Sequence, residues 1–327
     1  MINMVSNEII HKLTDNLLLS KYQVDSSGLY NGKVGIALGL FEAARYLHDD
    51  SIENEAFNLL QESLLSNNKD VSFENGLSGI GSVFLYLIEN QFIDADFEEI
   101  FKEHCEEIIK RFENIDKQPD FLLSSMKVIC FLTDLSKTRP NDKRIDEIIE
   151  KIFRGLELYL SIQFFDFKDI RYMKNKTSVM AVYETYLKLV DYSGYGNFSI
   201  SLLNAYAYLY RSGRIASSVY IGYYLDKILS KSNLNGYEDV IDSNLHNSIK
   251  NIHPDFLLLD QQIDLVKLVN NMDGKPKFNL LPNLNLIRQS LEDQIMITIE
   301  NGLLSLKYQF YLTRCLIYLT NKEMNLL

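Results

Sequence analysis

One short pattern restricts the fold of this chain more than any other feature: two small residues three positions apart open an apolar helical stretch. Gly32-Lys-Val-Gly35-Ile and Gly76-Leu-Ser-Gly79-Ile are 44 positions apart. Looser versions of the opening lie at Leu122, Asn175, Gly196, Asn247 and Gly302. A pattern that returns about every fifty residues indicates a repeat of helical hairpins.

Helical periodicity fills the segments between these openings. Apolar residues recur at i, i+3, i+4 and i+7 in 54–65, 97–113, 143–160 and 218–230, which predicts amphipathic helices. All five prolines lie between such segments. The one stretch that resembles a strand is 161–172, and we expect it to be extended. The sequence therefore predicts a nearly all-α protein.

The repeat also predicts an architecture. Each unit would pair a buried helix with a more charged outer helix, and six to seven such hairpins would close into an α/α toroid, a single domain over residues 1–327. The glycines would let the inner helices approach one another at one rim. The interval from 175 to 196 is too short for an outer helix. We expect either a missing helix there or a misplaced fourth opening.

Composition excludes several classes of partner. The chain has 44 acidic and 33 basic residues, a net charge of −11, which argues against nucleic acid or an anionic membrane as the main partner. Three cysteines without CxxC spacing indicate a reducing compartment. We find no signal peptide and no apolar run long enough to span a membrane. We therefore expect a cytoplasmic protein.

Residues 28–96 resemble the first two repeats of the lanthionine synthetase C-like proteins, in the stretches GLYNGKVGIALGLFEAARYL and SFENGLSGIGSVFLYLIENQFIDAD. The resemblance implies a toroid of seven hairpins that cyclises lanthipeptides. In that family two cysteines and one histidine hold a zinc ion, which binds the substrate cysteine as a thiolate. The cysteines come from Trp-Cys-Tyr-Gly and Cys-His-Gly stretches at the fifth and sixth openings.

The chain departs from the family at these zinc ligands. Gly194 stands where the first cysteine is expected, before the matching Tyr195. At the sixth opening Leu245 and Asn247 replace the cysteine and glycine, and His246 matches the histidine. The fourth opening reads Lys-Asn at 174–175 where the family commonly has His-Gly. We therefore predict that the zinc site is lost and that there is no cofactor.

The remaining cysteines and histidines do not suggest a replacement site. Cys130 and Cys315 would lie roughly 12 and 20 Å down their helices from the rim. His104 and Cys105 are adjacent, so they would not face one another on a helix. His253 is followed by a proline, which makes a helix shared with His246 doubtful.

Three functions follow from the sequence. The first is a zinc-less, non-catalytic binder of a precursor peptide or a partner dehydratase in a ribosomal-peptide modification pathway, through a rim formed by Tyr195, Asn244, His246 and Asn247. The alternative is a zinc-independent lanthipeptide cyclase with His246 and Tyr195 as acid–base groups. The third is an α/α-barrel carbohydrate enzyme with carboxylates from Asp191, Glu238, Asp239 and Asp242.

Overall fold

The computed structural model describes residues 2–66, 68–113, 119–168, 176–232, 234–251, 257–272, 284–300, 309–321 and 324. These residues form fifteen α-helices and one 3-10 helix, and they contain no strand, which confirms the all-α prediction. The elements are α1 (Ile2–Ser20), η1 (Lys21–Gln23), α2 (Lys33–Leu47), α3 (Asp50–Leu64), α4 (Leu77–Glu89), α5 (Phe97–Glu113), α6 (Pro119–Ser125), α7 (Val128–Thr138), α8 (Lys143–Phe167), α9 (Lys176–Ser193), α10 (Ile200–Arg211), α11 (Val219–Ser232), α12 (Glu238–Asn251), α13 (Leu259–Met272), α14 (Leu284–Glu300) and α15 (Gln309–Thr320). Within the described ranges, no helix is long and apolar enough to cross a membrane.

The helices form two compact units. Unit 1 combines both ends of the chain, Met1–Cys105 and His253–Leu327, and unit 2 is Glu106–Ile252. The boundary falls inside α5. A single domain over residues 1–327, and closure of the helices into a toroid, stay predictions.

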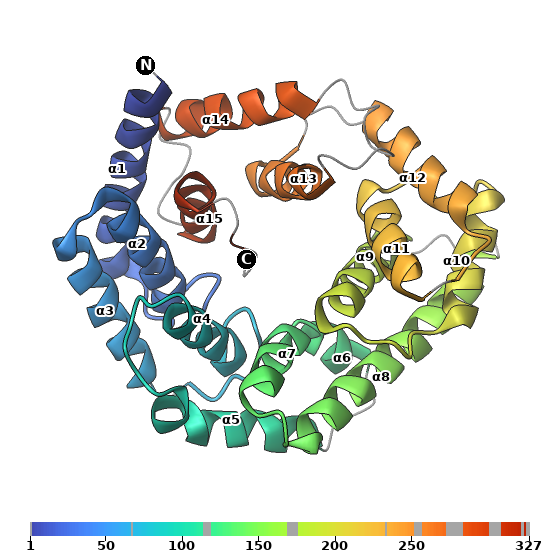
Figure 1. Cartoon of the computed structure of the whole chain (residues 1–327), viewed down its shortest axis with the longest axis horizontal. Helices are drawn as coiled ribbons and strands as arrows, with labels where there is room; N and C mark the ends of the chain where they lie inside the picture. The colour runs from blue at the N-terminus through green and yellow to red at the C-terminus, as the bar shows by residue number, and fades with distance from the viewer. Residues whose placement is uncertain are drawn as a thin grey trace. The chain divides into compact units, whose positions relative to one another are not determined.

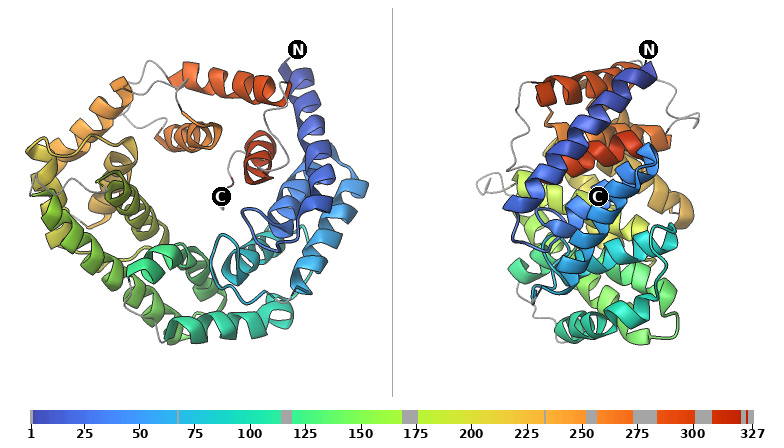
Figure 2. Two further views of the ribbon diagram at one scale, coloured as in Figure 1. Left: turned by 180° about the vertical axis from the view of Figure 1, so that it is seen from behind. Right: turned by 90° about the vertical axis from the view of Figure 1, so that its left-hand side faces the viewer.

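Unit 1 packs the last helix of the chain against the first ones. α2 contacts α4 and α15, and α15 contacts α13, while α1, α3 and α14 pack on these helices from a second layer. Figures 1 and 2 show α15 beside α2. A Cβ added at Gly39 would lie 3.2 Å from Leu17 on α1 and 3.3 Å from Thr313 on α15. Gly39 therefore lets three helices of the first and last repeats pack closely.

Unit 2 repeats this two-layer arrangement. α7, α9 and α11 pack in sequence on one another, and α8, α10 and α12 form the second layer, with α7–α8, α8–α9 and α11–α12 contacts between them. In the described residues of both units, the first layer contains seven helices, namely α2, α4, α7, α9, α11, α13 and α15. This number agrees with the predicted six to seven hairpins.

The two glycine openings lie where the sequence predicts. Gly32 is the N-cap of α2 and Gly76 is the N-cap of α4, each in an extended conformation. Leu122 does not open a long helix, because it lies inside the short α6 and the apolar helix begins only at Val128. The openings at Asn175 and Gly302 fall outside the described residues.

Residues 161–167 are helical, so the predicted extended segment is wrong over that range. Leu156, Leu160, Phe164 and Phe167 are all buried and follow one another at spacings of three and four. This apolar face continues α8 to its end, because a helix buries all four side chains together. Residues 169–172 lie outside the described part.

The interpretation of residues 175–196 also needs correction. α10, which follows Gly196, packs on α8 and α12 and belongs to the second layer. It is therefore the second-layer helix that follows α9 along the chain, and no helix is missing between them. The next helix of the first layer is α11, which begins at Val219. The small residues before α10 serve instead as a helix cap, since the Ser199 hydroxyl accepts a hydrogen bond from the Leu202 amide at 3.2 Å.

Candidate functional site

The glycines at the starts of α2 and α4 bring backbone against backbone. A Cβ at Gly35 would lie 1.9 Å from the carbonyl oxygen of Leu29, and a Cβ at Gly79 would lie 1.9 Å from that of Phe73. The two contacts are 44 residues apart at both ends. Only glycine allows a loop to approach its own helix so closely.

The same glycine-rich loops also bind each other. The amides of Leu29 and Tyr30 donate to the carbonyl of Glu74 at 3.0 and 2.8 Å. A Cβ at Gly28 would lie 2.5 Å from the Cα of Asn75. The first two repeats of unit 1 are thus joined through backbone atoms.

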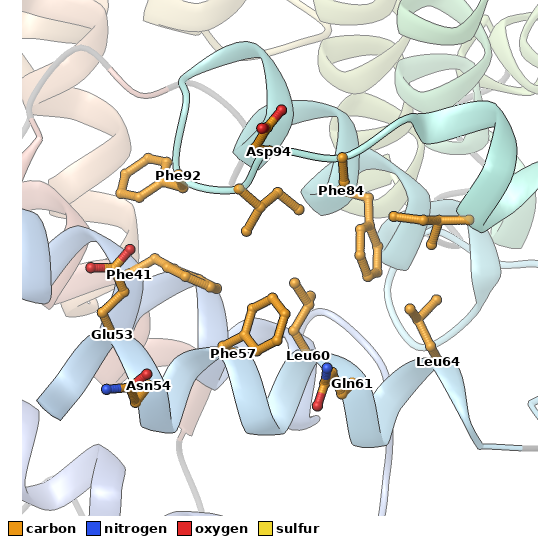
Figure 3. Close-up of a pocket in the computed structure, with 13 residues that line it drawn as sticks. Phe41, Glu53, Asn54, Phe57, Leu60, Gln61, Leu64, Phe84, Phe92 and Asp94 are labelled. Atoms are coloured by element: carbon orange, nitrogen blue, oxygen red, sulfur yellow. The ribbon is translucent and has the colours of Figure 1, made fainter. Parts of the chain in front are cut away.

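A cavity of about 410 Å³ lies in unit 1, between α3 and the segment that connects α4 to α5 (Figure 3). Its walls are mostly apolar, with aromatic rings from α2, α3, α4 and the connecting segment. The principal lining residues are Phe41, Phe57, Phe84, Phe92, Leu60 and Ile100. Phe57 remains 43% exposed. The cavity is therefore open to solvent on the α3 side.

Contacts with Arg45 and Phe41 hold the Phe92 ring in the cavity wall. The Arg45 guanidinium lies 3.3 Å from the centroid of the Phe92 ring and donates to the carbonyl of Asn90 at 2.6 Å. Phe41 meets the same ring edge-on, with centroids 5.7 Å apart. Two carboxylates, Glu53 and Asp94, are exposed residues of the cavity lining (Figure 3).

The residues predicted to form a rim lie on different elements of unit 2. Gly194 and Tyr195 follow the end of α9, and Gly194 has a left-handed φ of 67°. Tyr195 stacks on Phe153 of α8, with centroids 4.2 Å apart. Burial, with the nearby Glu157 and Glu150, raises the pKa of the Tyr195 phenol. Its hydroxyl therefore stays protonated near neutral pH.

The other rim residues are inside α12 and do not open a helix, so their predicted position is wrong. Asn244 is fully buried: its side-chain oxygen accepts from the Tyr206 hydroxyl at 3.0 Å and from the Ser218 amide at 2.9 Å. Leu245 is 4% exposed. The His246 Nδ1 lies 2.7 Å from the carbonyl of Asp242 one turn earlier, and Asn247 is exposed. Among the residues that the structure describes, no hydrogen bond or ring contact joins Tyr195 to this group.

Two of the chain's three cysteines are buried in unit 1. Cys105 and Cys315 are 0% exposed. Burial raises the pKa of the Cys315 thiol to about 12. Cys130, on α7 of unit 2, is half-buried. Among the described residues no group of three histidine, cysteine or acidic side chains is placed to hold a metal ion. His253 and Lys174 lie outside those residues.

Two of the carboxylates considered for a carbohydrate enzyme, Asp191 and Asp239, are stabilised as anions by basic neighbours. Although burial opposes it, Lys227 and Lys231 lower the pKa of Asp191, at 2.8 and 2.9 Å. Arg211 lowers the pKa of Asp239 through a bidentate contact at 2.6 and 2.8 Å. A glycosidase acid needs a raised pKa, so these two groups have the opposite character.

Two half-buried carboxylates of unit 2 escaped the sequence analysis. Glu157 accepts from the Tyr186 hydroxyl at 2.7 Å and from the Ser199 amide at 2.9 Å, and Glu184 accepts from the Ser218 hydroxyl. Burial raises the pKa of both carboxyls. In the sequence, each of these glutamates stands close to tyrosines on a predicted helix, and this pattern was the signal that could have revealed them.

A comparison with protein families matches residues 3–127 to the lanthionine synthetase C-like proteins. Neither the curated proteins nor the solved structures gave a match. The matched part contains both glycine-rich openings and the cavity. The match confirms the resemblance seen in the sequence.

Proposed function

We propose that this lanthionine synthetase C-like chain is a zinc-independent, non-catalytic binder in a pathway that modifies ribosomally made peptides. Its partner would be the precursor peptide or the dehydratase that acts on it. The proposal takes the family from residues 3–127 and takes the loss of chemistry from the positions of the cysteines.

The observation that carries the proposal is the burial of the thiols. The family resemblance implies two cysteine ligands for zinc, and a metal-binding cysteine must be a thiolate that the ion can reach. Cys105 and Cys315 are fully buried, and the pKa of Cys315 is raised to about 12. Cys130 lies in the other unit. A ligand set with two cysteines therefore has no second accessible thiolate.

Binding is supported by surfaces that do not need a metal. Tyr195, His246 and Asn247 are at least partly exposed and offer an aromatic ring, an imidazole and an amide. The cavity of unit 1 adds a larger apolar surface, in the part of the chain that matches the family. Aromatic side chains contribute much contact area at a small entropy cost, which suits peptide recognition.

The test combines metal content with peptide selection. Elemental analysis of the purified chain should find no stoichiometric zinc, and a phage-displayed library of random dodecapeptides should enrich on the immobilised chain. One zinc per chain, or a library that never rises above background, would overturn the proposal. Formation of a thioether from a peptide with dehydroalanine and cysteine would support the cyclase alternative.

A pair of variants tests the predicted rim. Tyr195→Ala with His246→Ala should weaken calorimetric binding of a selected peptide and leave the circular dichroism spectrum unchanged. The matched control is Tyr22→Ala with His11→Ala, two exposed residues of unit 1. If both double variants bind equally well, the peptide lies elsewhere on the chain.

A further inference from the structure

The cavity of unit 1 has both an apolar interior and an acidic surround, and this combination specifies its occupant. We propose that it docks a peptide segment in which a bulky apolar side chain is flanked by lysine or arginine. The inference rests on the proposed peptide-binding function and gives the chemistry of the partner.

The interior suits one large apolar side chain. Four phenylalanines, from three helices and the connecting segment, line a volume of about 410 Å³ (Figure 3). An engineered apolar cavity of roughly 150 Å³ already binds benzene, so a leucine or phenylalanine side chain fits here. Phe57 lies 43% exposed at the opening, where it can cover an inserted side chain.

The wall is preformed, which lowers the entropic cost of binding. Arg45 lies over Phe92 and donates a hydrogen bond to the carbonyl of Asn90, and Phe41 meets the Phe92 ring edge-on. Side chains that are already fixed lose little freedom when a ligand arrives. The connecting segment therefore does not have to fold around the peptide.

The surroundings of the cavity are acidic. Glu53 and Asp94 take part in no ion pair with any described residue. A second hollow, of about 540 Å³ and lined by Glu98, Glu99, Lys102, Glu103 and His104, shares Ile100 with the cavity. Three glutamates and one lysine are among its lining residues. Basic residues beside the apolar anchor would meet this charge.

The same charges select against other occupants. A second copy of the chain also carries a net charge of −11, so two acidic surfaces would repel each other. An acidic peptide would meet the same repulsion. The apolar anchor determines where the peptide sits, and its basic neighbours determine which peptide binds.

The experiment uses three fluorescein-labelled peptides and fluorescence anisotropy on the full chain. Their cores are Lys-Phe-Leu-Arg, Glu-Phe-Leu-Glu and Lys-Ser-Ser-Arg. Only the first should bind well, because it alone has both the anchor and the positive charge. Its affinity should fall about tenfold in Glu53→Gln with Asp94→Asn, and its salt dependence should flatten. The control Asp15→Asn with Asp25→Asn removes two exposed charges of unit 1 away from the cavity and should bind like the parent.

A second variant tests the apolar interior without removing any of its walls. Ala95→Trp places an indole in the cavity and should abolish binding of the basic apolar peptide. Equal binding of the acidic peptide, or binding unaffected by Ala95→Trp, would overturn the inference. So would a dimer in the parent that Ala95→Trp dissociates, which would assign the cavity to a second copy. If library peptides still enrich on Ala95→Trp, the inference fails and the proposed binding function stands.

Discussion

The substitutions Gly35→Ala and Gly79→Ala give the sharpest test of how the first two repeats are built. Each added methyl would lie 1.9 Å from a backbone carbonyl oxygen, of Leu29 or Phe73. That oxygen would have to move by about 1 Å to reach the shortest contact that Cβ atoms normally make. The loop cannot move freely, because its backbone is hydrogen-bonded to the helix start, as in Leu77 N to Asp70 O at 2.7 Å.

The expected cost follows from two opposing effects. Overpacking of a tight site costs roughly 1–3 kcal/mol, and the upper end applies because backbone must shift. Alanine in place of glycine inside a helix returns roughly 1 kcal/mol. A net destabilisation of about 2 kcal/mol remains. For a unit of about 180 residues this corresponds to a melting temperature lower by about 4–8 °C.

Thermal unfolding followed by circular dichroism measures this effect, and Gly196→Ala is the matched control. Nothing lies within 4 Å of a Cβ at Gly196, and its φ is not left-handed. That variant should gain about 0.4–1 kcal/mol by restricting the unfolded chain. If Gly35→Ala or Gly79→Ala behaves like Gly196→Ala, the close approach of loop and helix is not what requires glycine.

Three further predictions concern unit 2 and the metal. Burial raises the pKa of Glu184 in the folded state, so its contribution to stability is present at low pH and is lost as pH rises above about 4.5. The melting temperature should therefore decline as pH rises through this range, and Glu184→Gln should flatten the decline. Asn244→Ala leaves the Tyr206 hydroxyl and the Ser218 amide without their acceptor, and it should lower the free energy of unfolding measured in urea by about 2–4 kcal/mol. The control Asn247→Ala, at an exposed position of the same helix, should change this free energy by no more than about 0.5 kcal/mol. Addition of EDTA should leave the melting temperature unchanged, and a drop of several degrees would reveal a structural metal.

The helical repeat was visible in the sequence where a backbone contact demands one residue type. Gly35 and Gly79 each face a carbonyl six residues earlier, so the same spacing had to appear twice. The periodicity of the helices was equally plain. These are local requirements, which a single sequence displays directly.

The layer to which a helix belongs could not be read in this way. Gly196 and Ser199 gave the same small-x-x-small pattern, yet Ser199 acts as an N-cap for a helix of the second layer. Small residues before a helix can serve either as an N-cap or to let another backbone segment approach the helix closely. Which one applies depends on the neighbours that cover the helix, and α10 is covered by α8 and α12.

The cavity was hidden for a related reason. Phe41, Phe57, Phe84 and Phe92 come from four separate segments, and each aromatic residue taken alone fits an ordinary core position. Only their arrangement in space leaves a volume between them and an exposed Phe57 at its opening. The sequence directed attention instead to residues 194–195 and 244–247, where Asn244 is occupied inside the fold.

The helix starts of α2 and α4 in unit 1 and of α11 in unit 2 are held by different chemistry. In unit 1 the starts of α2 and α4 depend on glycine backbone contacts that no other residue allows. In unit 2 the start of α11 depends on side chains: the Ser218 amide donates to Asn244 and its hydroxyl donates to Glu184. Several polar residues can supply such bonds, so a recognisable motif is not required there. The match over residues 3–127 includes both of these glycine-dependent helix starts. The residues that line the cavity all lie in that same matched segment, so the proposed peptide site and the glycine-held helix starts can be tested in the same part of the chain.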